Sequence, residues 1–258
     1  MNITPGAYPF NCPSLWQLKE MTFSAPVTIL VGENGSGKST FLEALARKLR
    51  LPAIGSADAA QDASLDAVAP LCNRMKTVFS ARPKYGFFLR AEDFFGYTRR
   101  IAGMQKQFLD DLARVEQEYR HKSAFTQEQA RMAYADSLAA LYRDHGIDPD
   151  AQSHGESFIH LFQSRIRPGG LYLLDEPEAP LSPTRQLALI ALLLERAKDA
   201  QFILATHSPF LMAYPGAEIW SMDTTPAAQC SYDALDSVTL TRDFLNHHDR
   251  YIRQLQLP

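Results

Sequence analysis

The segment from Val27 to Leu49 places the tightest limit on the fold. Val27 to Val31 (VTILV) is a continuous run of apolar, mostly β-branched residues, which is typical of a strand covered on both faces in a parallel sheet. A glycine-rich loop, Gly32 to Thr40 (GENGSGKST), follows directly, and Ser39 to Leu49 (STFLEALARKL) has the composition of a helix. A strand, a glycine-rich loop and a helix in this order predict an α/β fold with a mostly parallel sheet.

The loop contains the pattern Gly-x-x-x-x-Gly-Lys-Ser, from Gly32 to Ser39. Its glycines let the backbone wrap closely around a phosphate group, and the following helix directs its positive end at the same anion. Lys38 supplies a positive charge to the β- and γ-phosphates, and the Ser39 hydroxyl is a ligand for Mg²⁺. A chance match in a turn is the alternative, but the strand before and the helix after favour a P-loop NTPase core. The candidate nucleotide-binding residues are Glu33, Asn34, Gly35, Ser36, Gly37, Lys38, Ser39 and Thr40.

Two further apolar runs lie in the second half of the chain. Leu171 to Leu174 (LYLL) leads into the pair Asp175-Glu176, and Phe202 to Ala205 (FILA) follows a strongly apolar helical stretch from Thr184 to Lys198. Strand–helix–strand alternation of this kind implies parallel strands with helices on both faces of the sheet.

The pair Asp175-Glu176 is a candidate for catalysis. It comes at the carboxyl end of an apolar strand, where ligands bind in open α/β sheets. Asp175 fits the Mg²⁺-associated acid of a P-loop enzyme, and Glu176 is placed to polarise an attacking water. A helix cap or a solvated acidic turn is the alternative, and the P-loop upstream favours the catalytic interpretation.

The middle of the chain has a different composition. Tyr85 to Phe95 (YGFFLRAEDFF) has a strand-like start, and about Arg99 to Arg143 is rich in helix formers, with a division at Ser123 to Thr126. We therefore expect one domain over 1–258, with its core at about 1–95 and 150–258. A helical lobe, at about 96–149, would be inserted between the P-loop and the later motifs.

The order of four motifs resembles the ATP-binding cassette ATPase superfamily. These are GENGSGKST, then Ser153 to Ser157 (SHGES), then LLDEPEAPLS, then Ala205 to Ser208 (ATHS), and they cover about residues 27 to 210. The wording of DEPEAPLS and ATHSPF is most similar to stand-alone AAA/ABC-type ATPases near the RecF, SMC and Rad50 branch and the OLD-type ATPases. The chain lacks the long coiled coil of SMC and Rad50.

The resemblance implies further site residues. Ser153, Gly155 and Glu156 align with the signature motif, which contacts the γ-phosphate held by a second subunit, although a plain serine cap with Glu156 closing a capping box is also open. His207 resembles the switch histidine that senses the γ-phosphate. Glu178 to Ser182 resembles the segment that crosses the dimer interface. ATP, Mg²⁺ and an ATP-dependent homodimer are therefore implied.

The end of the strand that starts at Tyr85 departs from the superfamily pattern. No glutamine ends the strand that starts at Tyr85. Glu92 occupies roughly that place, with Arg90 nearby, and a salt bridge at the edge of the core is the alternative role for either residue. Tyr8 and Phe10 are candidates for the aromatic side chain that contacts adenine.

The composition bears on the partners and the location of the protein. The net charge of −3 argues against a strongly basic face for nucleic acid, although it allows a local patch. Three scattered cysteines and an N-terminus without a signal-like segment lead us to expect a cytoplasmic protein. We expect an ATP-driven dimer switch, with nucleic acid or an effector protein as partner, in genome maintenance, DNA repair or phage defence. The alternatives are the ATP-binding subunit of a membrane transporter and a slow regulatory ATP switch.

Overall fold

The core of the molecule is a six-stranded sheet in the order β2-β3-β4-β1-β5-β6. A computed structural model describes residues 7–54, 63–145 and 154–256. The first five strands in that order are parallel, and β6 is antiparallel to β5. The strands are β1 (Val27–Val31), β2 (Tyr85–Arg90), β3 (Gly170–Asp175), β4 (Gln201–Ala205), β5 (Glu218–Ser221) and β6 (Ala228–Cys230).

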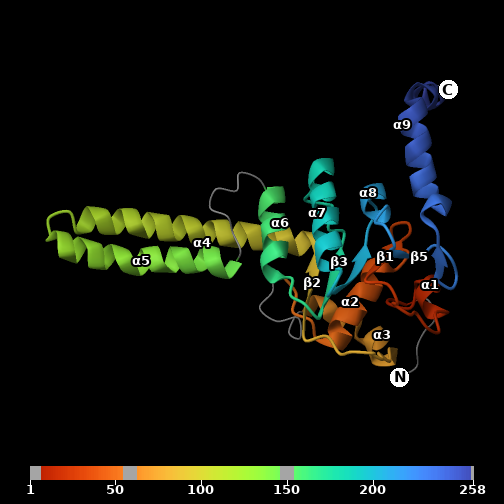
Figure 1. Ribbon diagram of the computed structural model, residues 1–258, viewed down its shortest axis with the longest axis horizontal. Coiled ribbons are helices and arrows are strands. Elements are labelled where there is room, and N and C mark those ends of the chain that lie inside the picture. The colour runs from red at the N-terminus through yellow and green to blue at the C-terminus, as the bar shows by residue number, and fades with distance from the viewer. Residues whose placement is uncertain (1–6, 55–62, 146–153, 257–258) are drawn as a thin grey trace.

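Helices cover both faces of this sheet (Figure 1). The helix that follows the glycine-rich loop packs on one face with α3, and α6 and α7 pack on the other. The helices are α1 (Pro13–Trp16), α2 (Lys38–Leu49), α3 (Ala69–Arg74), α4 (Ala91–Glu118), α5 (Ala124–His145), α6 (His154–Arg165), α7 (Pro183–Arg196), α8 (Pro209–Met212) and α9 (Asp236–Leu255).

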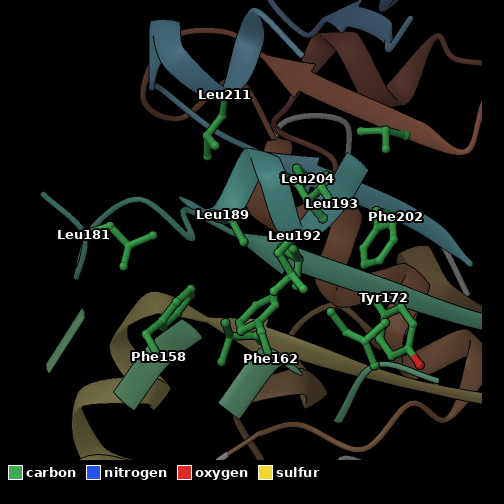
Figure 2. Close-up of a cluster of buried hydrophobic side chains, with 14 of the residues drawn as sticks. Phe158, Phe162, Tyr172, Leu181, Leu189, Leu192, Leu193, Phe202, Leu204 and Leu211 are labelled. Carbon is green, nitrogen blue, oxygen red and sulfur yellow. The ribbon is translucent and has the colours of Figure 1, made fainter. Parts of the chain in front are cut away.

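Alternate residues of each central strand divide between the two faces. In β3, Tyr172 and Leu174 join the cluster under α6 and α7, whereas Leu171 and Leu173 face α2. Figure 2 shows the first cluster, in which leucines of α7 lie against aromatic rings of α6 and the sheet. The Tyr172 and Phe202 rings stack at 5.3 Å between centroids. Burying one such side chain contributes about 1.5–3 kcal/mol, so this double-sided core explains the unbroken apolar runs of the strands.

Helices α4 and α5 form a hairpin that projects from the core (Figure 1). Near the base of the hairpin, Tyr97, Ile101 and Leu141 are buried in the main core cluster. On the other side of the core, α9 extends outward toward the C-terminus (Figure 1). In the part of the chain that the structure describes, no helix is both long and apolar enough to cross a membrane.

Most elements expected from the sequence are confirmed, and one boundary is wrong. The strands at Val27–Val31 and within Leu171–Leu174 and Phe202–Ala205 are present. The two lobe helices are present, and the break between them is at 119–123, slightly earlier than the expected division at Ser123 to Thr126. The strand that starts at Tyr85, however, ends at Arg90, and α4 begins at the next residue instead of near Arg99.

Candidate functional site

The glycine-rich loop joins β1 to α2 and contains three glycines with positive φ. Gly32, Gly35 and Gly37 have φ of 147°, 81° and 104°. A Cβ on Gly32 would lie 2.8 Å from the Ser36 hydroxyl oxygen, so the loop has no room for a larger residue there. Helix α2 begins at Lys38 without a side-chain cap, so its first N–H groups are available to an anion.

Lys38 is buried within this loop. Its Nζ donates hydrogen bonds to the carbonyl oxygens of Gly32, at 2.6 Å, and Glu33, at 3.0 Å. Burial lowers the pKa of Lys38, while nearby carboxylates, that of Asp223 foremost, oppose the shift. The ammonium group therefore sits in a desolvated, carboxylate-rich place where a phosphate would be a favourable partner.

Ser39, in the first turn of α2, is hydrogen-bonded to Asp175, the last residue of β3. The Ser39 hydroxyl donates to Asp175 Oδ1 at 3.1 Å. The pKa of Asp175 is raised from 3.8 to about 7, chiefly by burial. The Ser39 hydrogen bond lowers it, and the charges of Glu176 and Glu43 act in the same direction as burial. A buried carboxylate beside a hydroxyl, with its charge disfavoured, is an arrangement that a divalent cation would stabilise. The two residues therefore fit the Mg²⁺ that a P-loop site implies.

Glu176 and His207 lie side by side at the ends of β3 and β4. Glu176 adopts a left-handed φ of 50°, and its backbone N–H donates to Ala205 O at 2.9 Å. His207 Nε2 lies 3.9 Å from Glu176 Oε1, and both side chains are partly exposed. The His207 N–H donates to Glu178 Oε1 at 2.7 Å, which fixes the backbone after β4. Both side chains therefore stand at the open edge of the site.

The three signature-motif residues are only partly located. Ser153 lies outside the described residues, and so does the side chain of Glu156. Gly155 belongs to the first turn of α6, which begins at His154.

The structure places Arg90, and not Glu92, at the end of β2. Arg90 stands opposite Asp175 in the parallel register and is buried. Its Nε donates to Asp93 Oδ2 at 2.7 Å, and one terminal nitrogen lies 3.4 Å from Glu43 Oε1. The Glu92 side chain is 78% exposed in the first turn of α4. The edge of the site next to Asp175 is therefore occupied by a paired arginine.

The two adenine candidates differ in their surroundings. Tyr8 is exposed, and its hydroxyl donates to Glu43 Oε2 at 3.4 Å, beside α2. Phe10 is buried against Trp16, with ring centroids 5.5 Å apart, and the Arg74 guanidinium lies over both rings. Of the two rings, only Tyr8 is open to a ligand.

Asp223 belongs to the site and was missed in the sequence. Its Oδ1 accepts a hydrogen bond from the Glu33 N–H at 2.8 Å. The Met222 N–H donates to Val31 O at 2.7 Å, which brings the end of β5 against the start of the loop. No motif marks Asp223, and only the pairing of β5 with β1 places it there.

Two family models match parts of the chain. The model described as "AAA domain, putative AbiEii toxin, Type IV TA system" matches residues 157–213, and a second, described as "AAA domain", matches residues 11–47. These ranges contain the P-loop, Asp175, Glu176 and His207. No curated protein matches the chain.

Several solved structures are similar in outline. The Smc head domain of Pyrococcus furiosus is 13% identical with a TM-score of 0.39, covering 87% of this chain and 94% of that one. The SMC head domain of Thermotoga maritima is 16% identical with a TM-score of 0.35, covering 82% and 92%. A metal-chelate type ABC transporter is 17% identical with a TM-score of 0.36, covering 81% and 73%. Because these TM-scores lie below 0.5, the function rests on the residues of this chain and on the family models.

The sheet order and the glycine-rich loop define a P-loop NTPase, in which β4 lies between the loop strand β1 and the acidic strand β3. Both matching family models are described as AAA domains, which points to an ATPase among the P-loop NTPases. The chain is an ATPase, an enzyme that binds and hydrolyses ATP, and it is similar to AAA domains over these two ranges.

Proposed function

We propose that this ATPase is an ATP-driven dimer switch, in which two copies close around two ATP molecules and hydrolysis releases them. The hydrogen bond between Ser39 and Asp175, at 3.1 Å, carries the catalytic part of the proposal. It joins the phosphate-binding loop to the acidic strand at the place where a nucleotide-bound cation would be held.

The loop binds the phosphates of ATP. Lys38 exchanges its two backbone carbonyl partners for phosphate oxygens, and the uncapped N–H groups of α2 donate to the same anion. In this proposal Glu33 to Thr40 form the phosphate cradle, and Tyr8 is the aromatic side chain nearest the base.

Ser39 and Asp175 hold Mg²⁺ in the proposed site. When bound, the ion neutralises charge on the β- and γ-phosphate oxygens. Desolvation of Asp175 supports this role, because its raised pKa marks a carboxylate whose charge needs a cationic partner.

Glu176 orients the attacking water and accepts its proton. The water oxygen bonds to the γ-phosphorus as the bond to the bridging oxygen breaks. His207, 3.9 Å from Glu176, is placed to donate to the γ-phosphate. Glu178 holds the His207 backbone, so the segment after the catalytic glutamate also positions the histidine.

A second copy completes the site in this proposal. Glu176 and His207 are partly exposed, so one side of the site is open. We assign Ser153, Gly155 and Glu156 of the partner copy to the γ-phosphate on that side, and Glu178 to Ser182 to the contact between copies.

The cycle serves a partner that senses the dimer. We favour a nucleic acid or effector protein in genome maintenance or phage defence. The description of the model that matches residues 157–213 names a toxin of a toxin–antitoxin system, which supports a defence role. A transporter subunit and a slow regulatory switch are the alternatives. A membrane protein that copurifies would favour the first, and a single burst of phosphate without turnover would favour the second.

Two substitutions test the proposal. Glu176→Gln should bind ATP normally, lose about 10²- to 10⁴-fold in kcat, and elute as a dimer with ATP and Mg²⁺. Lys38→Ala should lose nucleotide affinity and remain a monomer. Glu195→Gln, a surface change on α7, is the matched control and should behave as the wild type. Nucleotide fluorescence, phosphate release and light scattering give the three readouts.

Either of two outcomes would contradict the assignment. If Glu176→Gln hydrolyses ATP at the wild-type rate, Glu176 is not the catalytic base. If ATP binding and phosphate release are normal but every variant stays monomeric with ATP, the dimer switch is wrong while the ATPase stands.

A further inference from the structure

A hollow lies at the opposite end of the sheet from the proposed ATP site. It has a volume of about 550 Å³ and is formed where α2 and α6 end and β2 begins. Three separate segments supply its cationic side chains. These are Lys48, Arg50, Arg82, Lys84, Arg165 and Arg167.

The lining of this hollow, which we call the basic pocket, contains no aspartate or glutamate. This is unusual in a chain whose net charge is −3. Among the residues that the structure describes, no carboxylate pairs with Lys48, Arg50, Arg82 or Lys84. Like charges at these four positions without carboxylate partners raise the free energy of the folded state, and a bound anion relieves that cost.

Two aromatic rings stand in the same pocket. Phe79 and Tyr85 are 38% and 47% exposed. The Arg167 guanidinium lies over the Tyr85 ring, 5.3 Å from its centroid. Exposed rings between cations are the combination that binds single-stranded nucleic acid, because phosphates pair with the cations and unstacked bases stack on the rings.

The pocket is built on fixed backbone. The Lys84 N–H donates to Gly169 O at 3.1 Å, and Tyr85 pairs with Gly170 in the parallel register. Arg50 adopts a left-handed φ of 54° where α2 ends, which turns the chain away from the helix. The backbone that carries these cations is therefore held at or near the ends of regular elements.

We propose that the basic pocket binds a single strand of nucleic acid, holding its phosphates with the cations and a base against Tyr85. A volume of about 550 Å³ suits a ligand of one or two nucleotides. The cations come from three segments, which favours charge spread along a strand over the clustered phosphates of one free nucleotide. The site is separate from the ATP site and does not depend on the proposed dimer.

Charge reversal at two pocket residues tests this proposal. The double variant Arg82→Glu/Lys84→Glu is compared with Arg120→Glu/Lys122→Glu, which has the same spacing and charge change at the exposed tip of the hairpin. Fluorescence anisotropy is measured with a labelled DNA 12-mer and an RNA of the same sequence. We expect at least tenfold weaker binding for the pocket variant and less than twofold change for the control.

Salt dependence and stacking give independent readouts. The pocket variant should reduce the slope of log K against log salt by about 1.4, because two phosphate contacts are lost at roughly 0.7 each. Tyr85→Ala should weaken binding about tenfold and leave the slope unchanged. Thermal unfolding and ATP binding, which should match the wild type, show that each variant is folded. If charge reversal unfolds the protein, Arg82→Gln/Lys84→Gln replaces it.

Several results would overturn the proposal. These are the absence of binding to either strand at low salt, equal losses in the pocket and control variants, and equal affinity for one free mononucleotide. Duplex binding as tight as single-strand binding would also overturn it. Lys38→Ala should still bind the strand, so a failed ATP site and a failed basic pocket are distinguishable.

Discussion

Asp175 is a buried carboxylate whose negative charge is disfavoured in the nucleotide-free protein. Burial raises its pKa from 3.8 to about 7. Between these two values the folded protein holds a proton that the unfolded chain has lost. The free energy of unfolding therefore falls as pH rises from about 4 to about 7, and the whole loss is present above pH 7.

Asp175→Asn should remove this pH-dependent loss in the free energy of unfolding. Without Mg²⁺ and nucleotide, we expect the variant to be more stable than the wild type at pH 8, with the difference shrinking by up to about 3 kcal/mol at pH 4.5. The same variant should lose Mg²⁺-dependent hydrolysis. Urea denaturation at the two pH values, with EDTA present, measures the effect.

The control is Asp110→Asn, which changes an exposed carboxylate on α4. The free energy of unfolding of Asp110→Asn should differ from that of the wild type by the same amount at both pH values. An Asp175→Asn variant whose relative stability is the same at both pH values would show that the carboxylate is ionised without penalty.

Single residues of the site could be predicted only where a local pattern marks them. Lys38, Ser39 and Asp175 follow from a glycine-rich loop and from a strand that ends in acids. Asp223 does not, and Arg90 was expected only as a neighbour of Glu92, with a salt bridge at the edge of the core as one of its possible roles. Arg90 reaches the site because β2 pairs with β3, and Asp223 because β5 pairs with β1. Pairing between strands far apart in the sequence leaves no mark in a single sequence.

At the scale of elements, the contact between β2 and β3 depends on Gly86. A Cβ there would collide with the Leu171 carbonyl oxygen and lie 2.9 Å from Leu51 Cδ2. We expect Gly86→Ala to destabilise the protein by about 1–3 kcal/mol, since the backbone of the neighbouring strand cannot move aside cheaply. The midpoint of urea denaturation measures the change.

Gly103→Ala is the matched control within α4. Its Cβ would meet no atom within 4 Å. Because alanine favours a helix over glycine, this variant should gain about 0.5–1 kcal/mol. Equal effects of the two substitutions would show that the β2–β3 contact adapts to the added methyl group.

Strands could be predicted from the sequence where burial on both faces requires a continuous apolar run. Continuous apolar runs identify β1 and β3 because both faces of those strands are covered. The boundary at Arg90 was not predictable, because aromatic residues stand on both sides of the change from strand to helix. The basic pocket was not predictable either, since its cations come from segments with no shared pattern.

At the scale of the whole molecule, the outer hairpin and the core share few contacts. Residues 109–137 include the tip of the hairpin, while Tyr97, Ile101 and Leu141 anchor its base. We expect replacement of 109–137 by a short glycine-serine linker to leave the core folded and ATP affinity within about threefold of the wild type. Thermal unfolding and nucleotide binding check this. Loss of ATP binding would mean that the lobe is part of the core.

Because α4 is long and starts beside the site, a small rotation at its first turn would produce a large displacement at its far end. The helix starts one residue after Arg90, which lies beside Asp175 in the sheet. Its 28 residues span about 42 Å, so a rotation of about 5° at its first turn would displace its far end by about 4 Å. If two copies close around ATP as proposed, a small rotation beside Asp175 would therefore reach a partner at the hairpin tip as a displacement of several ångströms.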